Sequence, residues 1–134
     1  KLDDLLKQSD YVVVTAPYTP QNENLISSAQ LSIMKPSARI VVTSRGRLVE
    51  QNALLSALRE GRLAGAALDT TAEEPLPADN ELWKLPNVII TPHIAGNSEK
   101  KLLDKRTVNI FGENLRRYLS KQPLINIVDK QLRY

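Results

Sequence analysis

Apolar residues gather in short runs along the first ninety or so positions of the chain, and polar segments separate these runs. The runs read YVVVT at 11–15, RIVVT at 39–43, AGAAL at 64–68 and NVIIT at 87–91. Short, continuous apolar runs of this kind are typical of parallel strands buried on both faces of a sheet. The pattern therefore predicts four β-strands in this part of the chain.

Helical spacing of apolar residues fills the segments before and between these strands. We expect helices at about residues 2–8, 28–34 and 51–60. The third is amphipathic, with Leu54, Leu55 and Leu58 on one face. It ends at Gly61, a residue that accepts the left-handed conformation common after a helix. Strands that alternate with helices predict an α/β fold with a parallel sheet.

A longer amphipathic segment follows at about residues 98–121, with Leu103, Phe111, Leu115 and Tyr118 along one stripe. The tail PLINIVDKQLRY then completes the chain. Such a tail either docks on another surface or is a self-packed or disordered terminus. We therefore expect two parts, with residues 1–97 as the α/β unit and residues 98–134 as a helix and tail.

Composition narrows the classes of function. The 134 residues carry a net charge of +3, and no Lys/Arg-rich run suggests nucleic-acid binding. The chain has no cysteine, which excludes a disulfide framework and a thiolate metal site, and no metal centre is expected. No apolar run approaches the roughly 18 residues of a membrane span, and the first residues lack the apolar core of a signal peptide. A cytoplasmic protein is the resulting expectation.

The residues that directly follow the predicted strands include the ionisable side chains of greatest interest. In open parallel sheets, ligands bind beyond the carboxyl ends of the strands. Because these ends meet at one edge, an arginine, two carboxylates and the only histidine of the chain are expected along one rim. The residues in question are Thr15, Ala16 and Pro17, then Thr43, Ser44, Arg45 and Gly46, then Asp69 and Glu74, and finally His93.

Each of these residues also has an ordinary structural explanation. Arg45 suits a surface cation, Asp69 a cap or turn residue, and His93 a side chain packed under the following helix. Glu74 suits one of a solvated pair of glutamates, and Glu73 beside it can face the site as readily. Their convergence on one edge nevertheless favours a functional site over four unrelated explanations.

Such a set of side chains suits hydride transfer between a 2-hydroxy acid and a 2-keto acid. An arginine holds a substrate carboxylate with two parallel hydrogen bonds. A histidine donates a proton to the developing alkoxide, or removes it in the reverse direction. A carboxylate bonded to the far ring nitrogen fixes the tautomer of the imidazole. This chemistry assigns Arg45 to substrate anchoring, His93 to acid/base catalysis and Glu74 to orientation.

Two stretches of the sequence carry a family resemblance. The segments SRGRLVEQNALLSALREGRLAGAALDTTAEEPLP and LWKLPNVIITPHIAG resemble the D-isomer-specific 2-hydroxyacid dehydrogenases. The likeness extends over essentially the whole chain. It implies an NAD(P)-dependent oxidoreductase acting on a small 2-hydroxy or 2-keto acid. The alternative is a non-catalytic interaction module, such as the co-repressors that share this nucleotide fold.

The resemblance also implies a fold and a set of site residues. The fold is part of a Rossmann-like doubly wound sheet, namely the second half of a dinucleotide-binding domain, with a long C-terminal helix. Arg45 matches the substrate-binding arginine, Glu74 before Pro75 the catalytic acid, and His93 the acid/base histidine. The residues that match cofactor contacts are Thr15, Ala16 and Pro17 beside the adenosine, Thr43 and Ser44 beside the nicotinamide ribose, Asp69 at the carboxamide, Gly96, and again Arg45 and His93.

One departure from the family pattern is large. Members carry a Gly-x-Gly-x-x-Gly turn that holds the cofactor pyrophosphate, and no three of the five glycines in this chain have that spacing. We therefore expect the isolated chain to be inactive or nearly so. The sequence does not indicate whether the cofactor is NAD or NADP. Residues 98–134 are expected to dock on a substrate domain. An unpaired sheet edge and an open apolar face favour a homodimer through the nucleotide domain.

Overall fold

The computed structural model describes residues 1–96 and 100–131 of the chain. It divides into two compact units, Lys1–Ala95 and Gly96–Tyr134. The first unit contains the sheet and the candidate site residues up to His93, and the second contains a single long helix and the tail. None of the described helices is long and apolar enough to cross a membrane.

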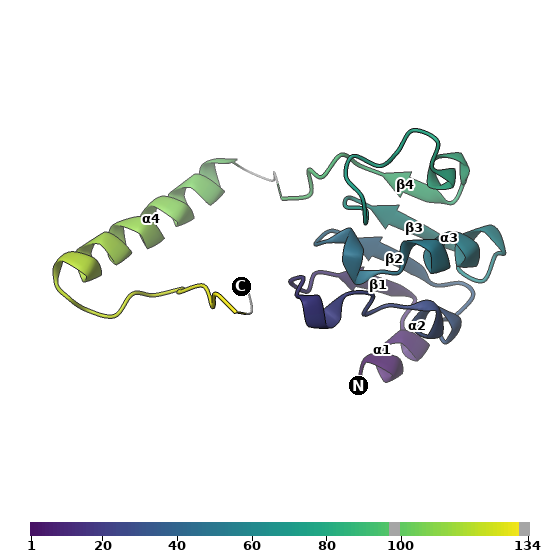
Figure 1. Ribbon diagram of the computed structural model, residues 1–134, viewed down its shortest axis with the longest axis horizontal. Coiled ribbons are helices and arrows are strands. Elements are labelled where there is room, and N and C mark those ends of the chain that lie inside the picture. The colour runs from purple at the N-terminus through teal and green to yellow at the C-terminus, as the bar shows by residue number, and fades with distance from the viewer. Residues whose placement is uncertain (97–99, 132–134) are drawn as a thin grey trace. The chain divides into compact units, whose positions relative to one another are not determined.

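The first unit is built on a four-stranded parallel sheet in the order β1-β2-β3-β4 (Figure 1). The strands are β1 (Tyr11–Val14), β2 (Arg39–Val42), β3 (Gly65–Leu68) and β4 (Val88–Ile90). All four lie within the predicted segments, each a residue or two shorter, and the α/β class with a parallel sheet is confirmed. The register aligns the last residues of the strands, pairing Val14 with Val42, Val42 with Leu68, and Leu68 with Ile90.

Three helices accompany the sheet, and they are α1 (Leu2–Gln8), α2 (Ser28–Ser32) and α3 (Gln51–Arg59). Helix α2 begins where the Ser27 hydroxyl accepts a hydrogen bond from the N–H of Ala29 at 3.3 Å. Helix α3 ends before Gly61, whose φ of 69° is the left-handed conformation expected from the sequence. Short 3₁₀ turns occupy Pro20–Asn22, Gly46–Leu48 and Glu81–Lys84.

These helices cover only one face of the sheet. Alternate strand residues such as Val12, Ile40 and Leu68 are buried in one cluster with leucines of α1, α2 and α3. On the opposite face, the side chains of Val13 and Ile89 are 57% and 66% exposed. The expectation that the strands are buried on both faces is therefore wrong within this unit. Right-handed crossovers between successive neighbouring strands place every connecting helix on the same face, which leaves the other face open.

The second unit consists of α4 (Lys100–Leu119) and a tail that folds back on it. The predicted start at residue 98 lies outside the described residues. Phe111 and Tyr118 of the predicted apolar stripe are 68% and 72% exposed. The side chain of Asn114 accepts a hydrogen bond from the N–H of Ile125 at 2.8 Å and donates one to its carbonyl at 3.0 Å. The tail is thus pinned to its own helix at Ile125.

Glu113 holds two arginines near the end of α4. Its carboxylate accepts hydrogen bonds from Arg116 at 2.8 and 3.0 Å and from Arg117 at 2.6 Å. The hydrogen bond from Arg116, followed by that from Arg117, lowers the pKa of Glu113 from 4.5 to about 2. The ionised carboxylate is therefore the form that these contacts favour.

We predict a pH dependence of α4 that depends on Glu113. Because its pKa is lowered in the folded chain, its stabilising contribution is complete above pH 4.5 and is lost as the pH falls toward about 2. Glu113→Gln should remove this change. ¹³Cα shifts of residues 113–119, recorded by NMR from about pH 6 to about pH 2 for both proteins, measure it. Identical pH profiles of the two proteins would contradict the prediction.

Candidate active site

The aligned strand ends bring four separate segments of the chain to one edge of the sheet. The residues that follow the strands are Thr15, Thr43, Asp69 and Thr91. Backbone hydrogen bonds continue the ladder past the strands, with the N–H of Thr43 bound to Val14 and the N–H of Thr91 bound to Leu68. The loops that leave this edge carry Arg45, Glu74 and His93.

Glu74 and His93 form the central contact of the site. Nδ1 of His93 lies 3.0 Å from Oε2 of Glu74. With Glu74 as the acceptor, this contact corresponds to the tautomer that carries the ring proton on Nδ1 and leaves Nε2 for a ligand. Both side chains are nearly half exposed, at 47% and 40%. The pair therefore lies in reach of solvent and of a substrate.

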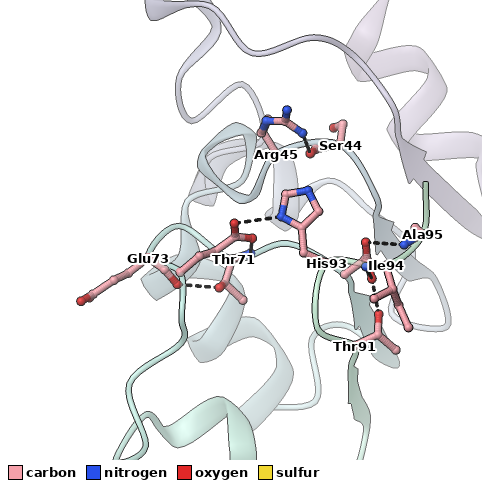
Figure 2. A network of polar contacts seen from close by, with 10 residues as sticks. Ser44, Arg45, Thr71, Glu73, Thr91, His93, Ile94 and Ala95 are labelled. Atoms are coloured by element: carbon pink, nitrogen blue, oxygen red, sulfur yellow. Dashed lines mark hydrogen bonds and ion pairs between the residues drawn. The ribbon is translucent and has the colours of Figure 1, made fainter. Parts of the chain in front are cut away.

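A tight turn fixes the carboxylate of Glu74. Its Oε1 accepts a hydrogen bond from the N–H of Thr71 at 3.1 Å. The Thr71 hydroxyl donates to the carbonyl of Glu73 at 2.6 Å, as Figure 2 shows. The structure thus places Glu74 against the imidazole, whereas the contact of Glu73 with this turn is made by its backbone.

His93 adopts a backbone conformation that is uncommon for residues other than glycine, with φ at 54°. Its N–H lies 3.0 Å from the carbonyl oxygens of both Asp69 and Thr91. In Figure 2 the imidazole projects to the side of the network on which Ser44 and Arg45 lie. The strand end and the loop together determine the direction of the ring.

Asp69 is the most buried ionisable group of the site, at 7% exposure. Its carboxylate accepts hydrogen bonds from the Thr91 hydroxyl at 2.5 Å and from the N–H groups of Ile94 and Ala95 at 2.9 Å each. The hydrogen bond from Thr91 is the main reason that the pKa of Asp69 lies below its ordinary value of 3.8. The two backbone N–H groups act in the same direction, and burial opposes them. Asp69 is thus held as a carboxylate.

Arg45 lies at the surface of this edge. Its Nη1 donates a hydrogen bond to the carbonyl of Ser44 at 2.7 Å, and it forms no ion pair with an acidic side chain of the described residues. Arg45 and Glu74 line one hollow of about 150 Å³. Glu74, His93 and Asp69 line a second hollow, of about 410 Å³. Glu74 therefore borders both spaces, and Arg45 keeps donors available for an anion.

A third hollow, of about 290 Å³, lies over the open face of the sheet. Its floor is apolar and includes Val41, Ala67 and Ile89, while Thr43 and Asp69 stand at its edge. A carboxylate has about four acceptor sites. In Asp69, three of them are taken by the Thr91 hydroxyl and by the N–H groups of Ile94 and Ala95. One site is left for the amide of a ligand. The hollow therefore combines an apolar floor with a hydroxyl and a carboxylate at its edge.

The other residues predicted to contact the cofactor make no hydrogen bonds or close contacts in the described residues that indicate a binding site. Thr15 and Pro17 are exposed and Ala16 is half-buried. A Cβ added at Gly96 would meet nothing within 4 Å, so the described residues do not explain a glycine there. The hydroxyl of Ser44 is buried without a partner among the described residues. No cluster of metal-binding side chains is found in residues 1–96 and 100–131.

Sequence reasoning missed two residues that shape the site, Thr71 and Thr91, and it placed Gly46 at the rim without giving it a role. A Cβ on Gly46 would lie 2.1–2.4 Å from backbone atoms of Thr71, so the loop after Arg45 rests directly on the turn that holds Glu74. The Arg-Gly pair is visible in the sequence, but its partner is not. Thr71 and Thr91 appear in the sequence only as hydroxyl residues near strand ends.

Comparisons with known proteins agree with this picture. The family model described as the NAD binding domain of D-isomer specific 2-hydroxyacid dehydrogenases matches residues 1–95. The glyoxylate reductase of Korarchaeum cryptofilum is 39% identical over 131 residues, which are 98% of this chain and 39% of that protein. The glyoxylate reductase of Pyrococcus horikoshii is 46% identical over 97 residues, which are 72% of this chain and 29% of that protein.

A solved structure agrees over nearly the whole chain. The D-isomer specific 2-hydroxyacid dehydrogenase of Xanthobacter autotrophicus Py2, in complex with NADPH and MES, matches with a TM-score of 0.89 and 35% identity. The match covers 99% of this chain and 53% of that one. The chain thus spans about two fifths of the length of the first curated relative and about half of this structure.

We predict that Gly46→Ala separates the Arg45 loop from the Glu74 turn. Because the added methyl group would meet backbone rather than a flexible side chain, the loop must move, and the first unit should lose about 1–3 kcal/mol of stability. Urea unfolding measures the loss, and amide shifts of Thr71 and Glu74 locate it.

The matched control is Gly112→Ala in α4, where a Cβ meets nothing within 4 Å. That change should not destabilise the first unit. Equal unfolding midpoints of the first unit for the two variants, with unchanged shifts at Thr71, would show that the close contact has no consequence.

Proposed function

The chain belongs to the D-isomer-specific 2-hydroxyacid dehydrogenase family, and from that premise we propose that it carries the catalytic side chains of an oxidoreductase. The reaction is hydride transfer between NAD or NADP and a small 2-hydroxy or 2-keto acid. The observation that supports it best is the 3.0 Å contact of Glu74 with His93, beside an exposed Arg45 that has no acidic partner among the described residues.

Arg45 anchors the substrate in this proposal. Its guanidinium presents donors in a planar fork that matches a carboxylate, and it also polarises the carbonyl next to that carboxylate. Since Glu74 is already held by Thr71 and His93, it does not neutralise Arg45. The arginine therefore keeps its charge for the acid.

His93 acts as the general acid and base. Its Nε2 gives a proton to the substrate oxygen as negative charge develops there, and takes it back in the reverse direction. Glu74 holds the proton on Nδ1 and stabilises the imidazolium that forms when the alcohol is oxidised. The two carboxylates of the edge thus have different tasks, because Glu74 faces the imidazole and Asp69 faces the loop and the open sheet face.

A bound nicotinamide cofactor supplies or accepts the hydride. The residues that would hold it are Asp69 and Thr43 at the hollow over the open sheet face, where the fourth acceptor site of Asp69 suits the carboxamide. Thr15, Ala16, Pro17, Ser44 and Gly96 are assigned to the remainder of the cofactor by the family resemblance.

Substrate class and partners follow from the relatives and the surface. Because both curated relatives described above are named glyoxylate reductases, we propose glyoxylate as the first substrate to test. Residues 98–134 are proposed to form an exit helix and tail that dock on a substrate domain. The part of the open face around Val13, which does not line the hollow assigned to the cofactor, is proposed as part of a homodimer interface through the nucleotide domain.

We predict that activity appears when the chain is joined to the remainder of a family member. A chimera in which this chain replaces the 131 matched residues of the Korarchaeum cryptofilum glyoxylate reductase is expected, from the family pattern, to supply a pyrophosphate-binding turn. It should oxidise NADH or NADPH with glyoxylate, while the 134-residue chain alone should be at least about a hundredfold slower because it binds the cofactor weakly. A folded but inactive chimera would instead favour a non-catalytic interaction module.

Substitutions in the chimera separate the roles of the three side chains. His93→Gln should lower kcat by about 10²–10⁴-fold through loss of proton transfer. Glu74→Gln should lower kcat by about tenfold or more, since the ring loses its orienting charge. Arg45→Lys should mainly raise the KM of the keto acid, because a lysine cannot form the two parallel bonds.

Matched controls lie beside two of these residues. Glu73→Gln changes the neighbouring carboxylate, and Arg47→Lys changes a cation that pairs with Glu23 at 3.7 Å. Both should leave kcat and KM nearly unchanged. If Arg47→Lys and Arg45→Lys raise KM equally, Arg45 is not the specific anchor, and an unchanged kcat for His93→Gln would refute its acid/base role.

A further inference from the structure

A single residue holds the loop that carries His93. The carbonyl of Asp69 accepts the N–H of His93 at 3.0 Å. Its Oδ1 accepts the Thr91 hydroxyl at 2.5 Å and the N–H of Ile94 at 2.9 Å, and its Oδ2 accepts the N–H of Ala95 at 2.9 Å. Asp69 thus forms hydrogen bonds to residues before and after His93 in the chain, and to the backbone N–H of His93 itself.

The register of the sheet explains how one residue reaches so much of the loop. Leu68 of β3 pairs with Ile90 of β4, and the N–H of Thr91 bonds to the Leu68 carbonyl at 3.0 Å. Asp69 and Thr91 are therefore the first residues beyond two paired strands. At 7% exposure, the hydrogen bonds of the Asp69 carboxylate are formed largely out of water, where bonds to a charged group are strong.

The backbone of His93 needs such support. A φ of 54° is unfavourable for a side chain with a Cβ, and it persists only where the surroundings determine it. The two N–H groups that follow His93 point at the Asp69 carboxylate, which a relaxed loop would not require. These bonds fix the backbone on which the ring stands 3.0 Å from Glu74.

We propose that Asp69 is a positioning residue for His93, in addition to the cofactor contact implied by the family resemblance. Its carboxylate fixes residues 91–95 so that Nδ1 meets Glu74 and Nε2 is presented to the substrate. The catalytic meaning of this role rests on the proposed function, whereas the structural role does not. The cofactor contact uses the remaining acceptor site of the carboxylate, so the two roles are compatible.

Thr91→Val tests the positioning role without changing the charge of Asp69. It removes the hydroxyl donor of residue 91 and leaves the Asp69 carboxylate in place, including the acceptor site proposed for the cofactor. The matched control is Thr70→Val, because Thr70 is 2% exposed and its hydroxyl has no partner among the described residues. Both variants replace a threonine hydroxyl by a methyl group, and only Thr91→Val breaks a hydrogen bond to Asp69.

NMR on the 134-residue chain reads the loop directly, since His93 is the only histidine and gives a single set of imidazole resonances. Thr91→Val should speed amide exchange of Ile94 and Ala95 by about tenfold or more and shift the imidazole signals. Thr70→Val should change neither. The inference is wrong if the two variants give the same exchange rates and imidazole spectra.

Kinetics of the chimera described above give the second readout. Thr91→Val should lower kcat by about tenfold, with a smaller change in the KM for the cofactor because both contacts share the Asp69 carboxylate, and Thr91→Ser, which keeps the hydroxyl, should restore kcat. Asp69→Asn should lower kcat and raise the KM for the cofactor, because it disturbs both roles. An effect of Thr91→Val on the cofactor KM alone would overturn the proposal. If the unmodified chimera is inactive, the proposed function fails, and the NMR comparison still decides the positioning role.

Discussion

The in-register pairing of four parallel strands is the constraint on which the rest of the structure depends. Because Val14, Val42, Leu68 and Ile90 lie at one level, the next residue of each segment emerges at the same edge. Backbone pairing thereby brings segments that lie far apart in the sequence to one edge of the sheet. A shift of one strand by one residue would turn its side chains to the other face and remove a member of the site.

The loops that follow the strands position the side chains of the site, and they do so mainly through contacts of backbone groups. The N–H of Thr71 holds Glu74, and Gly46 lets the Arg45 loop rest on the Thr71 backbone. These contacts direct Glu74 to the histidine rather than to the arginine. A salt bridge between Glu74 and Arg45 would neutralise the group proposed to bind the substrate carboxylate. The value of the arrangement lies in keeping opposite charges near each other but unpaired.

The sequence predicted the elements and the contact of Glu74 with His93, but it did not predict the other contacts between loops. Periodicity and the Gly61 cap are local signals, so the strands and helices of the first unit were placed to within a few residues. The positive φ of His93 and the clash that a Cβ at Gly46 would make depend on tertiary register, which no local pattern contains. The same limit explains the wrong expectation for the sheet faces, because burial of Val13 and Ile89 is decided by where the crossovers place the helices.

Asp69 connects the two sides of the site because it borders two hollows. One contains Glu74 and His93, and the other lies over the apolar residues of the open sheet face. If a nicotinamide ring occupies the hollow over the open sheet face, its carboxamide shares a carboxylate with the loop that orients the imidazole. Donors added to a carboxylate compete for its charge, so the cofactor contact and the bonds to Thr91, Ile94 and Ala95 cannot be energetically independent. Cofactor binding and the placement of the acid/base group would then be coupled through one side chain.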